Sequence, residues 1–202
     1  PVLFPGQAQG LHPDEITIAR LLQDDGYATR IIGKWHCGDQ PEFLPTRHGF
    51  DGWFGLPYSN DMGRQAFPQE GQPYRKVMES LGTPLPDDAP MFQPRPPLPL
   101  MLDEDVVAEQ PDQAALTERY LTDAVQFLRN NRDRPFFLYL PYFSVHGPRE
   151  AKPASLAAAR AAASSPDSDS VYAAMCADLD AAVGVVLGAL DRLGLAEDTM
   201  VV

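Results

Sequence analysis

The sequence predicts an α/β fold in which helices flank a largely parallel sheet. Segments with apolar residues at helical spacing alternate with short apolar segments of strand length, and this alternation is typical of such a sheet. One strand segment is almost continuously apolar, as expected for a strand that is buried on both faces. With 202 residues, of which 44% are hydrophobic and 22% charged, the chain is long enough for one domain with a sizeable core.

The first predicted unit is a helix followed by a strand. Residues 13–15 (Pro-Asp-Glu) suit the first turn of a helix, because proline tolerates that position and acidic side chains favour the positive end of the helix dipole. Ile18 and Leu21 begin its apolar face. Gly26 can end the helix in the left-handed conformation, and a strand over residues 27–32 follows.

Two further units follow the same pattern. A helix over residues 112–130 precedes a strand over residues 136–142. A third helix over residues 170–193 stops at Gly194, and residues 200–202 begin another strand. The buried stripe of the third helix is predicted to be Val171, Met175, Leu179, Val183, Val186 and Leu190.

Residues 38–111, between the first two units, are less regular. Their second half is rich in proline, which excludes a regular helix there. Met91, Phe92 and Leu98 offer apolar anchors, so we expect an ordered, Pro-rich insertion at about 62–111 that lies over the sheet edge. A second segment, residues 149–169, is rich in alanine and serine and is expected to be an exposed loop.

The composition excludes some classes of function. A net charge of −12 argues against nucleic-acid binding, because a phosphate backbone needs a basic surface. No apolar run has the length of a membrane span. Cys37 and Cys176 are too few to define a disulfide framework or a zinc site.

The candidate site comes from residues that follow two predicted strands. Lys34 and His36 come just after the first strand, and His146 comes just after the second. Ligands of open parallel sheets bind outside the carboxyl ends of the strands, so these side chains are expected to meet there and to hold and protonate an anion. The alternative is a surface lysine, a core histidine and a loop histidine that caps a carbonyl group.

A turn over residues 57–61 supplies Ser59, whose hydroxyl could donate to an anion; an ordinary turn is the alternative. His48 is interpreted as a structural residue of an aromatic, Gly-rich packing segment, and His12 as a loop residue. The chain has no phosphate-binding loop, no nucleophile elbow, no His-Glu-x-x-His and no compact cluster of acidic metal ligands. Residues 103–105 (Asp-Glu-Asp) are interpreted as a solvated charge run.

Three short motifs stand in order along the chain: Gly-Lys-Trp-His at 33–36, His-Gly-Phe-Asp at 48–51 and Pro-Tyr-Ser-Asn-Asp at 57–61. Further matching segments are residues 107–111, 116–120, 134–139, 146 and 179–184. Taken together, these segments resemble the sulfatase family, and specifically its arylsulfatase A-like branch, over nearly the whole chain.

The resemblance implies an alkaline-phosphatase-like α/β fold and the hydrolysis of sulfate esters. In this family a formylglycine, in its hydrated form, attacks sulfur, and a divalent cation, usually Ca²⁺, stabilises the charge. The resemblance implies that Lys34 and Ser59 bind the sulfate. It also implies that His36 hydrogen-bonds the formylglycine hydroxyl and helps to expel sulfate, and that His146 binds or protonates the leaving oxygen.

The chain departs from the family at the nucleophile. Cys37 is followed by Gly-Asp-Gln-Pro and Cys176 by Ala-Asp-Leu-Asp, and neither matches the family's Cys-x-Pro-x-Arg or Ser-x-Pro-x-Arg. We therefore expect the nucleophile and the first metal ligands before Pro1, and the second pair of metal ligands after Val202. On this interpretation residues 1–202 are a partial sulfatase catalytic domain, truncated at both ends, with no metal ligand of its own and no activity alone.

Two other functions stay open at this point. One is a phosphoryl or phosphonate hydrolase of the same superfold, and the other is a catalytically inactive sulfatase-like binding protein. The expected partners of the complete protein are a small-molecule or glycan sulfate ester and the formylglycine-generating enzyme. The family resemblance also implies a periplasmic, secreted or lysosomal location.

Overall fold

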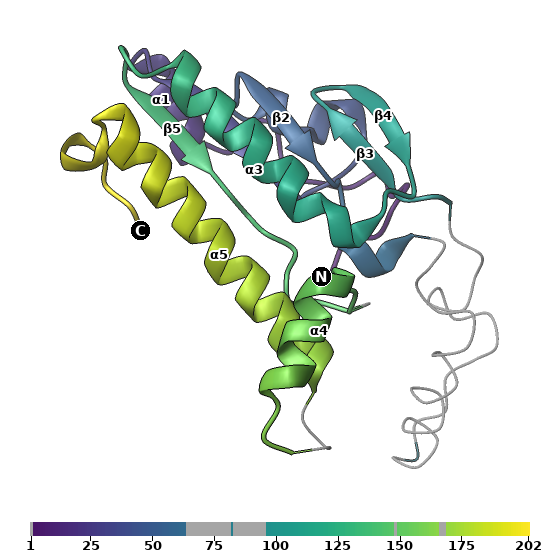
Figure 1. The fold of residues 1–202 in the computed structure, drawn as a ribbon. Helices are drawn as coiled ribbons and strands as arrows, with labels where there is room; N and C mark the ends of the chain where they lie inside the picture. Colours follow the sequence, from purple (N-terminus) through teal and green to yellow (C-terminus); the bar gives the residue numbers. More distant parts are fainter. Residues whose placement is uncertain (1, 64–81, 83–95, 148, 166–168) are drawn as a thin grey trace.

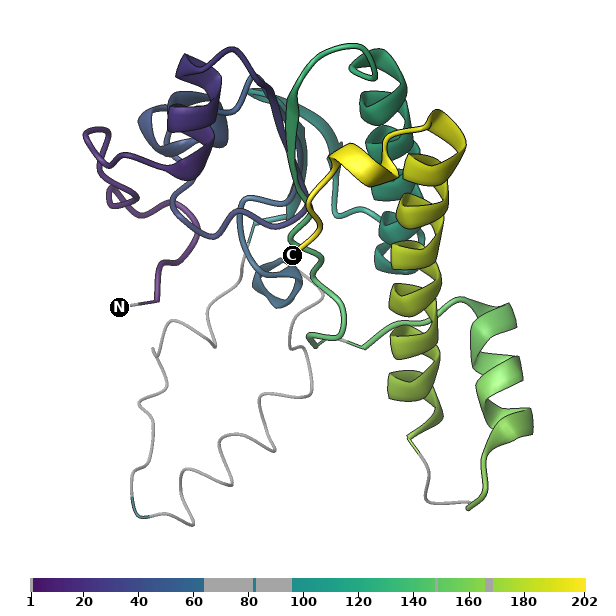
Figure 2. The same ribbon diagram turned by 90° about the vertical axis from the view of Figure 1, so that its left-hand side faces the viewer.

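A five-stranded sheet runs through the protein in the computed structural model, which describes residues 2–63, 82, 96–147, 149–165 and 169–202. The helix α1 (Ile18–Asp24) lies on one face of the sheet. The helices α3 (Gln113–Asn130) and α5 (Ser170–Leu193) lie on the other face, and α4 (Pro153–Ala162) packs beside α5 (Figures 1 and 2). The predicted α/β architecture is therefore confirmed.

The sheet is mixed rather than largely parallel. Its order is β4-β3-β2-β1-β5, and the central strand β1 (Ala28–Ile32) runs parallel to both β2 (Gly52–Gly55) and β5 (Phe136–Tyr139). The strands β3 (Pro99–Leu102) and β4 (Asp105–Glu109) form an antiparallel hairpin that pairs antiparallel with β2. A connection of only two residues permits no other pairing of these two strands.

The hairpin comes from the predicted insertion at 62–111. Its turn includes Asp103, whose φ of 54° lies in the left-handed region that aspartate tolerates better than most residues. The end of the insertion therefore extends the sheet edge instead of covering it. Residues 64–81 and 83–95, which make up most of the proposed insertion, lie outside the described residues.

The strand β2 was missed because its sequence, Gly-Trp-Phe-Gly, is short and carries glycine at both ends. Gly55 is required by the close approach of the backbone that follows β1. A Cβ at Gly55 would collide with the carbonyl oxygen of Gly33, whereas a Cβ at Gly52 would meet the end of the Arg30 side chain, which can move. Trp53 is fully buried, so the predicted packing role of this segment also holds.

The long helices match their predicted bounds, but α1 and α4 differ. α1 begins at Ile18, because the hydroxyl of Thr17 accepts a hydrogen bond from the backbone N–H of Arg20 and caps the helix there. The predicted start at residues 13–15 is therefore wrong. The expected loop at 149–169 contains α4, whose alanines are strong helix formers and whose Pro153 occupies the first turn.

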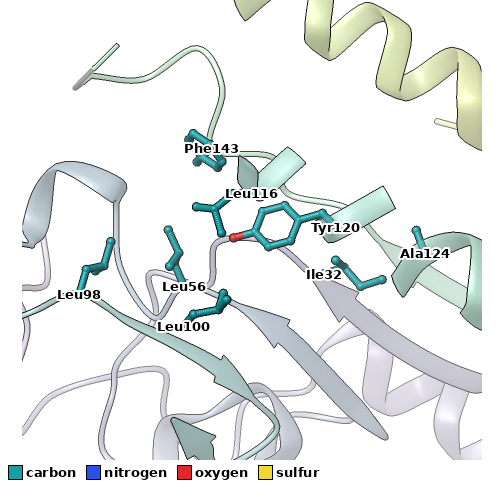
Figure 3. Packing of buried hydrophobic residues seen from close by; sticks show 8 residues of the cluster. All are labelled: Ile32, Leu56, Leu98, Leu100, Leu116, Tyr120, Ala124 and Phe143. Atoms are coloured by element: carbon teal, nitrogen blue, oxygen red, sulfur yellow. The ribbon is translucent and has the colours of Figure 1, made fainter. Parts of the chain in front are cut away.

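Buried apolar residues pack on both faces of the sheet, and β1 contributes to each face. The side chain of Ile32 points into the core under α3, whereas that of Ile31 points to the α1 face. The core under α3 (Figure 3) consists of Ile32, Leu56, Leu98, Leu100, Leu116, Tyr120, Ala124 and Phe143. The alternation of neighbouring side chains along β1 explains why this strand is almost wholly buried.

The predicted stripe of α5 is partly confirmed. Met175 and Leu190 are buried as predicted, whereas Val183 is 44% exposed. The other buried positions of the helix are Ala174, Ala182 and Ala189. The small side chains face inward because α5 packs closely on α3 and α4. The expectation that no apolar segment has the length of a membrane span does not hold for α5, which is long and apolar enough to cross a membrane by length and composition alone, a test that core helices of soluble proteins pass as well.

Residues 199–202 were predicted to begin a strand. They follow a short 3₁₀ turn at Ala196–Asp198, and they pair with no strand of the described sheet. Met200 is 87% exposed and Val201 is 61% exposed. The structure therefore assigns no strand to them.

Candidate active site

Three loops meet at the carboxyl ends of β1, β2 and β5. The backbone N–H of His36 donates to the carbonyl oxygen of Pro57 over 2.9 Å, beyond the end of β2. The N–H of Lys34 donates to the carbonyl oxygen of Pro141 over 2.9 Å, beyond the end of β5. The segment that carries Lys34 and His36 is therefore fixed between the loop of Ser59 and the loop of His146.

The backbone of His36 is left-handed, with φ at 62°. Its Nε2 lies 3.2 Å from the carbonyl oxygen of Leu3, and its ring meets the ring of Tyr58 edge-on at a centroid distance of 5.4 Å. A histidine in an uncommon backbone conformation, held by contacts on two sides, presents its ring in one direction.

Burial lowers the pKa of His36 below its ordinary value. The carbonyl group of Leu3 opposes that shift, the positive charge of Lys34 adds to it, the carboxylate of Asp61 opposes it, and His146 adds to it. These residues belong to separate loops, yet each acts on the same imidazole. The neutral form of His36, which can accept a proton, is favoured at its position.

Ser59 and His146 are direct neighbours. The hydroxyl oxygen of Ser59, whose residue is 2% exposed, lies 3.4 Å from Nδ1 of His146. The same nitrogen lies 2.7 Å from the carbonyl oxygen of Gly147, so the tautomer with hydrogen on Nδ1 donates there. In that tautomer Nε2 is the free acceptor of the His146 ring.

The carboxylate of Asp61 completes the cluster. Its Oδ1 lies 4.0 Å from Nδ1 of His146, and its side chain is 22% exposed, against 49% for that of His146. Asp61 belongs to the 3₁₀ turn Asn60–Met62, which follows Ser59 directly. One short turn therefore supplies both a hydroxyl group and a carboxylate to the site.

A buried pair of amides anchors that turn. The Nδ2 of Asn60 donates to Oε1 of Gln113 over 2.8 Å, and the Nε2 of Gln113 donates to the backbone oxygen of Asn60 over 2.9 Å. Asn60 is 0% exposed and Gln113 is 2% exposed. Because Gln113 begins α3, this pair ties the turn to a helix from a distant part of the sequence.

The structure thus brings together the four side chains that the sequence singled out: Lys34, His36, Ser59 and His146. Their chemical roles stay predictions. Asp61, Asn60 and Gln113 were not assigned to the site from sequence. Asp61 carried a usable signal, since it stands two positions after Ser59 in the same motif, whereas nothing local to Gln113 indicates its partner.

The remaining histidine and cysteine candidates include His48, which was interpreted as structural, and the two cysteines. His48 is 1% exposed and its ring packs 5.8 Å from that of Trp35, in agreement with a structural role. Cys37 and Cys176 are free thiols. Within the part of the chain that the structure describes, no group of three or more His, Cys, Asp or Glu side chains could hold a metal ion.

Comparison with known proteins gives consistent matches. A family model described as Sulfatase matches residues 2–202. Arylsulfatase A of Homo sapiens is 34% identical and covers 100% of this chain, and steryl-sulfatase of Mus musculus is 33% identical and covers 98%. The chain spans 37% and 38% of the lengths of these two relatives.

Solved structures share the fold of this chain over most of its length. The crystal structure of Ps i-CgsB in complex with k-i-k-neocarrahexaose has a TM-score of 0.68 and 29% identity, covering 94% of this chain and 39% of its own. The PsFucS1 sulfatase from Pseudoalteromonas sp. has a TM-score of 0.69 and 24% identity, covering 96% of this chain and 38% of its own.

Proposed function

Because the chain belongs to the sulfatase family and has its alkaline-phosphatase-like α/β fold, we propose that the protein hydrolyses sulfate esters. One observation carries the proposal beyond family membership. Lys34, His36, Ser59 and His146 come from three loops and meet at one edge of the sheet. A cation, a hydroxyl group and two imidazoles are a set that suits an anionic sulfate ester, on whose oxygens further negative charge develops in the transition state.

Each of these residues has a proposed task. The ammonium group of Lys34 and the hydroxyl of Ser59 bind sulfate oxygens. His36, in its neutral form, accepts the proton from the nucleophile's hydroxyl group as sulfate is expelled. His146, with hydrogen on both ring nitrogens, binds or protonates the leaving oxygen through Nε2–H while Nδ1–H donates to the carbonyl oxygen of Gly147.

The proposed nucleophile is a formylglycine made from a cysteine or serine by the formylglycine-generating enzyme, and the proposed cofactor is Ca²⁺. When bound, the cation would stabilise negative charge on the sulfate. The described residues do not fit a metal ion, since they include no suitable group of ligands.

The proposed substrate is a small-molecule or glycan sulfate ester. Selectivity among such esters is assigned to the segment at about 62–111, because it begins beside the turn that carries Ser59. Exchanging this segment with that of a relative should change the substrate preference, and an unchanged preference would contradict the assignment. A location outside the cytoplasm (periplasm, lysosome or medium) is proposed on family resemblance alone.

The test compares hydrolysis of 4-nitrophenyl sulfate and 4-nitrophenyl phosphate by the purified full-length protein in the presence of Ca²⁺. We expect a higher kcat/KM for the sulfate, loss of activity with a chelator and recovery when Ca²⁺ is restored. Peptide mass spectrometry should identify formylglycine. The isolated 202-residue polypeptide, which contains no Cys-x-Pro-x-Arg or Ser-x-Pro-x-Arg, should be inactive.

Each alternative function has its own outcome in this assay. Preference for the phosphate ester, without formylglycine, would replace the proposal with phosphoryl transfer. Binding of sulfate esters without turnover of either substrate, and without a nucleophile, would replace it with the binding-protein function. Turnover by the isolated polypeptide above the level of its His36→Ala variant would contradict the expected absence of the nucleophile.

A further inference from the structure

We propose that Asp61 is a positioning residue that acts through both histidines of the site, by setting the charge of His36 and the orientation of His146. The proposal rests on the proposed sulfatase function. It adds a residue that neither the sequence analysis nor the comparisons assigned to the site.

Asp61 lies close to His146. The Oδ1 of Asp61 lies 4.0 Å from Nδ1 of His146, close enough for an ion pair when the imidazole is protonated. Besides Asp61, that nitrogen faces the hydroxyl of Ser59 and the carbonyl oxygen of Gly147. All three are oxygen atoms, so they favour the ring orientation that directs the N–H toward them.

Charges of both signs act on His36. The groups that face it are the carbonyl group of Leu3, the ring of Tyr58, the ammonium of Lys34, the carboxylate of Asp61 and the ring of His146. Lys34 and His146 disfavour a proton on His36, whereas Asp61 favours one. Asp61 is thus the only carboxylate among the described charges that act on His36. Its negative charge offsets the positive charge of Lys34, which the proposed sulfate site requires.

Hydrogen bonds hold the turn that carries Asp61. The N–H of Met62 donates to the carbonyl oxygen of Ser59 over 2.9 Å, which closes the turn around Asp61. The preceding residue, Asn60, is bound to Gln113 by two hydrogen bonds. A carboxylate on such a turn stays near His146, as a positioning residue must.

A second carboxylate nearby provides a matched control. Asp39 accepts hydrogen bonds from the N–H of Gly6 over 2.7 Å and from Nε2 of Gln40 over 3.0 Å, and it lies 3.5 Å from the hydroxyl of Tyr58. It is not among the charges that act on His36. Asp39→Asn therefore removes one negative charge from the same region without touching the two histidines.

The experiment measures histidine ring signals by NMR during a pH titration of the full-length protein, with the His36 signal identified by its loss in His36→Asn. Asp61→Asn should move the titration of His36 to lower pH, because it removes a negative charge that favours the proton. Asp61→Glu should restore part of the shift. Asp39→Asn should leave the titration where it is in the parent protein.

The kinetic readout is the pH profile of kcat/KM on a sulfate ester. Because His36 acts in its neutral form, Asp61→Asn should move the acidic limb to lower pH, together with the NMR titration. The loss of the oriented His146 ring should also lower kcat about a hundredfold with little change in KM, the lower end of what an acid–base group contributes. A purely structural role would lower activity without moving the limb.

Two results would overturn the proposal: an unchanged His36 titration in a folded Asp61→Asn variant, or an equal shift in Asp39→Asn. The NMR measurement does not need turnover, so it separates this proposal from the proposed function. A protein that hydrolyses no sulfate ester, but whose His36 signal shifts only in Asp61→Asn, would overturn the function and support the role of Asp61.

Discussion

The buried amides of Asn60 and Gln113, 53 positions apart in the sequence, are joined by two hydrogen bonds: side chain to side chain in one direction and side chain to backbone in the other. The pair joins the turn that carries Ser59 and Asp61 to the first residue of α3. The N-terminus of that helix therefore helps to hold the site together.

Gln113→Leu should lower the free energy of unfolding by about 2 kcal/mol or more, because each buried polar group left without a partner costs about 1–3 kcal/mol. Gln126→Leu, at an exposed position of the same helix, should change it by no more than about 0.5 kcal/mol. Urea denaturation of both variants tests the difference. Equal losses would mean that the amide pair contributes nothing specific to stability.

Lys34→Ala should lower kcat/KM on a sulfate ester by about two to three orders of magnitude in the complete enzyme, since one charge-assisted contact to the developing anion is lost. Lys152→Ala removes the same charge from a lysine that pairs with Glu118 on α3, and it should leave kcat/KM unchanged. Steady-state kinetics measures kcat/KM of both variants. A loss of less than tenfold in Lys34→Ala would show that this lysine is not at the sulfate.

Asp123→Asn should destabilise the fold by about 1–3 kcal/mol. Asp123 on α3 accepts two hydrogen bonds from Arg30 on β1, at 2.6 and 3.0 Å, and both side chains are largely buried. The variant leaves the arginine charge without its partner in that position. Asp133→Asn is the control, because the Arg132–Asp133 pair is exposed and such pairs contribute about 0–1 kcal/mol.

His48→Phe should weaken the loss of stability at acid pH. Burial, and then the positive charge of Arg20, lower the pKa of His48, so the unfolded chain binds the proton more readily than the folded one. Stability is therefore retained above the ordinary histidine pKa of about 6.5 and is lost as pH falls below it. His36 contributes in the same direction and keeps part of the dependence in the variant.

Thermal unfolding at pH 5 and pH 7 measures this effect. The difference in Tm between the two pH values should be smaller in His48→Phe than in the parent protein. His12→Phe changes an exposed histidine and should leave the difference as it is. If both variants behave like the parent protein, His48 does not control the acid sensitivity.

The helices that sequence reasoning placed well carry local signals at both ends. Asp112 and Asp169 cap α3 and α5 through their side chains, and Gly194 ends α5 in the left-handed conformation, as predicted. The strand β2 was missed because Gly55 is explained only by the close approach of the Gly33 backbone, which is distant in sequence. The helix α4 was missed although its alanines favour a helix, because an alanine- and serine-rich segment was interpreted as an exposed loop.

The candidate site was predictable where it depended on strand ends. Lys34, His36 and His146 follow apolar strands, and parallel strands bring their carboxyl ends to one edge. Asp61 stands in the same motif as Ser59, but the direction of its side chain was not predictable, because it depends on what anchors the turn. That anchor, Gln113, becomes a neighbour only in the folded chain.

The left-handed backbone of His36 restricts which substitutions can occupy position 36. Asparagine and glycine accept a φ of 62° readily, whereas a β-branched residue such as valine pays a conformational penalty of about 1–3 kcal/mol. A variant with valine at this position would lose the imidazole and part of its fold together, and its inactivity would have two causes. The asparagine variant separates them, so it is the substitution that reports on the chemistry of the ring alone.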